Sequence, residues 1–185
     1  MSGSRDHASE RAREFVGVFH ADPDRFARFS AASADDLPLG PRTLLAHASH
    51  MTLAMERFHG GPVRLVVASR RDCDDGRYAR EILLTAADGR IVQYGIVRLD
   101  LDRLPAAAAA AIRLESEPLG RILLSAGLLC DVHDVELLRV ATGPEFAAVL
   151  TAAEGVVTFG RVATIRLDGH AVIELLEIVA PGTAG

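Results

Sequence analysis

The sequence predicts one α+β domain, in which helices come first and a mostly antiparallel β-sheet of about six strands follows, with helices packed on it. Three observations lead to this expectation. Apolar residues recur at helical spacing up to Gly60, whereas short segments rich in β-branched residues dominate from Val63 onwards. Asp-Gly pairs at 88–89 and 168–169 each separate two such segments, which is typical of β-hairpins.

The composition is that of a folded protein without a nucleic-acid-binding surface. The chain has 185 residues, 49 % of them hydrophobic, which is enough for one core. We expect residues 1–185 to form one domain, made of an N-terminal helical segment (1–40) and a main region (41–181). The net charge is −5 and aromatic residues are 5 % of the chain, so we expect no nucleic-acid partner. The oligomeric state is left open.

The N-terminus and the cysteines indicate a cytoplasmic protein. The first residues are charged and carry no apolar core of a signal peptide, and no apolar run reaches the length of a membrane span. We therefore expect no membrane partner. Cys73 and Cys130 form no C-x-x-C pair, so both are expected to be free thiols.

The helices are predicted from apolar spacing and from helix start and stop signals. Asp22-Pro23 suits a helix start, Ser49 is a candidate N-cap, Gly60-Gly61 ends a helix and Pro118 interrupts one. The predicted helices are 5–19, 23–32, one broken or two short helices within 43–61, a broken helical segment within 101–127, and 143–152.

The strands are predicted from runs of β-branched and aromatic residues on either side of turn signals. The predicted strands or extended segments are 63–69, 77–86, 91–99, 128–140, 156–167 and 170–179.

The first hairpin places an arginine on an apolar face. Counting from Asp88-Gly89 puts Arg80 opposite Val97 and Ile82 opposite Gly95. Because an unpaired buried charge is costly, Arg80 needs an anion. A glycine inside a strand often marks the close approach of a ligand, so Gly95 is a candidate site residue.

The second hairpin repeats this arrangement with the opposite charge. A straight count from Asp168-Gly169 puts Glu177 opposite Gly160, with Arg161 and Glu174 on the other face. One β-bulge would exchange the two faces. The simplest alternative to a ligand site is that Arg80 pairs with Glu177, or that both reach solvent at the sheet edge.

Several segments together resemble the chorismate pyruvate-lyase family in order and spacing. They are YAREILLTAADGRIVQYG at 78–95, EPLGRILL at 117–124, FGRVATIRLDG at 159–169, ELLEIVAP at 174–181, and upstream SHMT at 49–52. Each is short, and the joint order carries the resemblance.

The resemblance implies a six-stranded antiparallel sheet with an internal ligand site beneath helical flaps. It also implies conversion of chorismate to 4-hydroxybenzoate and pyruvate, without a metal or an organic cofactor. On this reading Arg80 binds a substrate carboxylate and Glu177 assists proton transfer. The residues expected to contact the substrate are Met51, Gly95, Leu119 and Arg161.

Other readings stay open at this stage. The last hairpin is one residue longer here than in the family, so Glu174 is a second candidate for the site carboxylate. His47 and His50 share a helix face, and Glu56-x-x-His59 has metal-ligand spacing, but such sites need further ligands. Two alternative functions are an enzyme that acts on another carboxylated substrate and a non-catalytic protein that binds an aromatic or carboxylic acid.

Overall fold

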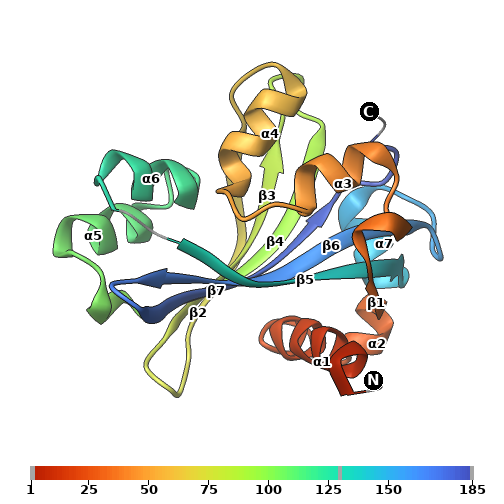
Figure 1. Ribbon diagram of the computed structural model, residues 1–185, viewed down its shortest axis with the longest axis horizontal. Helices are drawn as coiled ribbons and strands as arrows, with labels where there is room; N and C mark the ends of the chain where they lie inside the picture. The colour runs from red at the N-terminus through yellow and green to blue at the C-terminus, as the bar shows by residue number, and fades with distance from the viewer. Residues whose placement is uncertain (1–2, 129–130, 184–185) are drawn as a thin grey trace.

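The computed structural model describes residues 3–128 and 131–183 and contains one antiparallel sheet (Figure 1). Within these residues the sheet has seven strands in the order β1-β5-β6-β7-β4-β3-β2. The prediction of a single α+β domain with an antiparallel sheet is confirmed, with one strand more than the six expected. The described residues include no helix that is long and apolar enough to cross a membrane.

Six of the seven strands fall where the sequence predicts them. The bounds of the strands are β1 Ala27–Ala32, β2 Arg64–Asp72, β3 Tyr78–Thr85, β4 Ile91–Leu99, β5 Asp131–Thr142, β6 Val157–Leu167 and β7 His170–Val179.

Seven α-helices surround the sheet in the described part of the chain, and most match the prediction. They are α1 Gly3–Gly17, α2 Pro23–Phe26, α3 Leu39–Leu45, α4 Met51–His59, α5 Ala106–Leu114, α6 Leu119–Ser125 and α7 Pro144–Leu150. The N-cap position of α4 is His50, whose side chain makes no capping hydrogen bond, rather than the predicted Ser49, and the helix ends at Gly60 in the left-handed conformation. The thiol of Cys73 is free, as predicted, whereas Cys130 lies outside the described residues.

The predicted helix 23–32 is wrong beyond Phe26. Asp22 caps a single helical turn, and the chain then continues as the edge strand β1 beside β5. The backbone carbonyl of Phe26 accepts a hydrogen bond of 2.8 Å from the amide of Gly143, which fixes this change of direction. A Cβ at position 143 would lie 2.1 Å from the carbonyl oxygen of Arg25, so only glycine allows the two segments to meet.

The first hairpin has the predicted register but a different turn. Arg80 faces Val97 and Ile82 faces Gly95, as counted. The turn is one residue longer than the two-residue loop, because Ala86 rather than Ala87 bonds to residue 90. A bulge next to Leu84 compensates for this difference, so the two deviations cancel.

The second hairpin has the predicted turn but a different register. A bulge between Ile165 and Arg166 shifts the pairing by one residue. Glu177 therefore faces Arg161 rather than Gly160, and the straight count that put Arg161 on the other face is wrong.

One face of the sheet is covered by α1, α2 and α7, which bury an aromatic cluster around Phe26, Tyr94 and Phe146. Three ionisable side chains, Glu81, Tyr94 and His20, form a cluster at this layer. Glu81 accepts a 2.6 Å hydrogen bond from the hydroxyl of Tyr94, and it lies 2.8 Å from His20 Nε2. Burial raises the pKa of Tyr94 well above its usual value, so this hydroxyl stays a donor.

The opposite face carries two separate pairs of helices. Helices α3 and α4 pack on one half of this face, and α5 and α6 pack on the other half (Figure 1). The two pairs meet where α4 contacts α6. The space between this contact and the sheet contains the candidate site.

Candidate functional site

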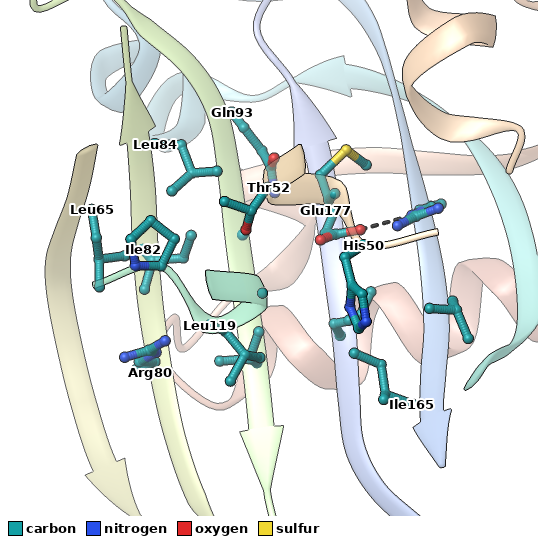
Figure 2. Close-up of a pocket in the computed structure, with 18 residues that line it drawn as sticks. His50, Thr52, Leu65, Arg80, Ile82, Leu84, Gln93, Leu119, Ile165 and Glu177 are labelled. Atoms are coloured by element: carbon teal, nitrogen blue, oxygen red, sulfur yellow. Dashed lines mark hydrogen bonds and ion pairs between the residues drawn. The ribbon is translucent and has the colours of Figure 1, made fainter. Parts of the chain in front are cut away.

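The six residues expected to act on or contact the substrate all line one cavity. The cavity lies between β3, β4, β7 and β6 below and the first residues of α4 and α6 above (Figure 2). The six residues are Met51, Arg80, Gly95, Leu119, Arg161 and Glu177. The cavity has a volume of about 50 Å³, so a ligand the size of a small organic acid requires its walls to move apart.

Arg80 is a buried cation whose charge is not paired. Its side chain is 1 % exposed, and no carboxylate in the described residues lies within ion-pair distance. Its one hydrogen bond, of 3.3 Å, goes from Nη1 to the carbonyl oxygen of Ile112, and Nε has no partner. Burial lowers the pKa of Arg80, whereas Tyr78 and Glu115 nearby raise it.

Arg161 is equally buried, but its guanidinium is paired with a carboxylate and with backbone carbonyl groups. Its Nε donates to Glu177 Oε2 at 2.7 Å. The Nη atoms donate to the carbonyl oxygens of Leu45, the last residue of α3, and of His47 and Ser49 in the connection between α3 and α4. The Arg161–Glu177 pair therefore joins this connection to the sheet. The alternative in which Arg80 pairs with Glu177 is wrong.

Glu177, not Glu174, is the carboxylate of the cavity. Glu174 lies on the other face of β7, where it pairs with Arg77 and Arg98. The bulge at Val172 of β7 shifts the pairing with β6 and places Arg161 opposite Glu177. Glu177 itself stays on the cavity face, because the register between β7 and β4 is regular from Gln93 to Leu99.

The two glycines near the charges have packing roles of their own. A Cβ at Gly95 would lie 3.3 Å from the carbonyl oxygen of Leu176 and 3.4 Å from Ile82. A Cβ at Gly160 would lie 2.7 Å from the carbonyl oxygen of Glu177. Close backbone approach therefore requires glycine at position 160, whereas a Cβ at Gly95, which lines the cavity, would be tightly packed.

Helices α4 and α6 close the cavity by direct contact. A Cβ at Gly120 would lie 2.8 Å from the hydroxyl of Thr52, so these helices touch at their first turns. An ion pair between Arg121 and Glu56 holds them together near the surface. Opening the cavity requires this contact to separate.

The histidines of this region are neutral polar groups rather than metal ligands. Burial is the main cause that lowers the pKa of both His47 and His50 below 6.5. His50 lines the cavity, while Nδ1 of His47 bonds to Ser49. Among the residues that the structure describes, no group of three or more His, Cys, Asp or Glu side chains is placed to hold a metal ion. Glu56 is paired with Arg121 instead.

Sequence reasoning missed four polar or small residues that line the cavity. They are His50 as a lining residue, Thr52, Gln93 and Gly120. Gln93 could have been found, because it alternates with Gly95 on the same face of β4. The role of Gly120 depends on how two helices meet, which no local pattern reveals.

Comparison with known proteins shows similarity in fold to bacterial regulators. No protein-family model matches the chain, and no curated protein matches it. The effector domain of PhnF from Mycobacterium smegmatis aligns with a TM-score of 0.53 and 18 % identity, over 74 % of this chain and 91 % of that domain. The structure of PhnF from the same organism aligns with a TM-score of 0.52 and 17 % identity, over 74 % of this chain and 66 % of that one.

A third structure gives the same picture. It is the ligand-binding domain of a protein described as a GntR-family transcriptional regulator from Bordetella bronchiseptica. It aligns with a TM-score of 0.51 and 13 % identity, over 65 % of this chain and 86 % of that one. At such identities the comparison establishes a shared fold.

These findings correct the assignment to the chorismate pyruvate-lyases and the activity that it implied. The three structures compared above are PhnF, the effector domain of PhnF and the ligand-binding domain of a transcriptional regulator, and none is described as a lyase. A lyase reaction and its substrate, chorismate, are therefore not supported.

Proposed function

We propose that this chain is a non-catalytic small-molecule-binding domain, of the kind that senses an effector in transcriptional regulators, and that its ligand is a carboxylic acid. The ligand occupies the cavity, and its carboxylate pairs with Arg80. The fold shared with effector domains supports the class of protein. The observation that carries the ligand chemistry is the unpaired charge of Arg80.

The physical reason is the cost of burying a charge. A guanidinium removed from water without a counter-charge is unfavourable, and a bidentate carboxylate is the partner that its geometry fits best. The other buried arginine of the cavity, Arg161, has a counter-charge from within the protein, because it pairs with Glu177. Leaving Arg80 without one is explained if the ligand brings it.

The role in a regulator also changes the expected partners. Transcriptional regulators act on DNA, so we expect an assembly that contains this domain to have a DNA partner. This replaces the sequence-based expectation of no nucleic-acid partner. A cytoplasmic location is consistent with this role. The predicted domain extent and the predicted site residues enter the proposal unchanged, except that the roles of Arg80 and Glu177 become binding roles.

The test is a thermal-shift screen with aliphatic and aromatic carboxylic acids. A ligand at a hundred times its Kd stabilises the folded state by about 2.7 kcal/mol, or about 5–10 °C in Tm for a chain of this size. We expect such a shift for the wild type and for Arg139→Gln, which alters an exposed arginine of β5. Arg80→Met should lose the shift, and the acid should be recovered unchanged after incubation. Equal shifts in Arg80→Met would contradict the proposal.

A further inference from the structure

The cavity has two chemically different ends. Arg80 lies at one end, and Glu177 lies at the other beside Gln93, as Figure 2 shows. Arg80 faces Val97 of β4, and Val97 faces Leu175 of β7, two residues before Glu177. From strand spacing and rise, the Cα atoms of Arg80 and Glu177 are about 12 Å apart. A ligand that pairs with Arg80 therefore presents its far end to Glu177.

Hydrogen-bonding capacity is unused at this second end. Glu177 binds Arg161 through Oε2, and within the described residues Oε1 has no hydrogen-bond partner. Gln93 is 2 % exposed, and its Oε1 also lacks a partner. If the amide is rotated to exchange oxygen and nitrogen, a donor is left unpaired there instead. Buried polar groups are almost always paired, so the ligand is expected to carry a polar group at this end.

The space between the two ends is apolar. The strands contribute aliphatic side chains, and Leu119 of α6 covers them from above. The apolar side chains of the sheet that line the cavity are Leu65, Ile82, Leu84, Val97, Val132, Ile165 and Leu175. The middle of the ligand should therefore be a hydrocarbon chain or an aromatic ring.

Charge and hydrogen bonding together select the polar group. The cavity holds the charges of Arg80, Arg161 and Glu177, while His50 is neutral at pH 7 because burial lowers its pKa. The sum is one positive charge, which a ligand with one negative charge neutralises. A hydroxyl donates to Glu177 Oε1 and, with the Gln93 amide rotated to place its NH₂ group there, accepts from Gln93. An ammonium only donates and adds a second positive charge.

We infer that the ligand is a hydroxycarboxylic acid with a net charge of −1, which places its carboxylate on Arg80 and its hydroxyl between Glu177 and Gln93. The inference depends on the proposed function and specifies the ligand class of the same cavity. One cation at the acid end also favours a carboxylate over the more highly charged phosphate.

Matched pairs of acids test this inference by calorimetric titration. The probes are hexanoate and its terminal hydroxy derivative, and phenylpropanoate and its para-hydroxy derivative. A hydrogen bond to a charged group strengthens binding by ~10- to 100-fold, so in at least one pair the hydroxy acid should bind tighter by this factor. The terminal amino derivative of hexanoate and hexyl phosphate should bind more weakly than the hydroxy acid.

Two variants locate the effect. Gln93→Leu keeps the Arg161–Glu177 pair and should bind both members of a pair with similar Kd, as should Glu177→Gln if it folds. Arg139→Gln should keep the full difference. Equal Kd values for both members of each pair in the wild type would overturn this inference alone. Tighter binding of the amino acid or the phosphate would also overturn it. No binding of any acid would overturn the proposed function as well.

Discussion

Replacing Arg80 by methionine should make the ligand-free protein more stable, although it destroys the proposed site. Met fills a similar volume and removes a buried charge with one hydrogen bond of 3.3 Å and an unpaired Nε. Replacing buried ionic groups by apolar residues stabilises by up to about 4 kcal/mol, and an unsatisfied buried donor costs about 1–3 kcal/mol. We expect a gain of about 1–3 kcal/mol, or about 2–12 °C in Tm.

Arg161→Met is the matched control, because both arginines are 1 % exposed and line the same cavity. This change leaves Glu177 buried without its partner, which costs about 3–5 kcal/mol. Urea unfolding of both variants without ligand gives the comparison. Our reasoning is refuted if Arg80→Met loses as much stability as Arg161→Met, because Arg80 would then be a structural cation and not one reserved for a ligand.

Three further results are expected from unfolding measurements. Gly120→Ala should cost about 1–3 kcal/mol by overpacking against Thr52, and Thr52→Ala should recover part of this loss in the double variant. Tyr94→Phe should cost about 1–3 kcal/mol in urea unfolding, because Glu81 loses its 2.6 Å donor, and acid binding on the other face should not change. The pKa of His50 is lowered below 6.5 on folding, so the unfolded chain binds its proton first as the pH falls. Stability should therefore decrease below about pH 6.5, and less so in His50→Gln; identical pH profiles would contradict this.

Most of the fold could be predicted from sequence because its signals are local. Strand composition and the two Asp-Gly turns located six strands, and helical spacing located most of the helices. Strand β1 was missed because its short alternation is also compatible with a helix. Its conformation depends on pairing with β5 and on the contact between Phe26 and Gly143, which lie far apart in the sequence.

The site illustrates where counting along a strand succeeds and where it fails. The face of Arg80 was predicted correctly only because a longer turn and a bulge cancel in the first hairpin. In the second hairpin a bulge stands alone, so the same counting gave the wrong partner for Glu177. A bulge depends on packing across the whole sheet, and no residue near Ile165 indicates it. The choice between Arg161 and a ligand as the partner of Glu177 was therefore beyond local reasoning.

Successive positions of β3 connect the two faces of the sheet. Arg80 points into the cavity, and the next residue, Glu81, points to the other face, where it lies 2.8 Å from His20 just after α1. If the backbone of β3 moves at Arg80, Glu81 moves as well, and so does its contact with His20. One peptide unit of β3 therefore links a side chain of the cavity to a side chain that contacts the segment after α1.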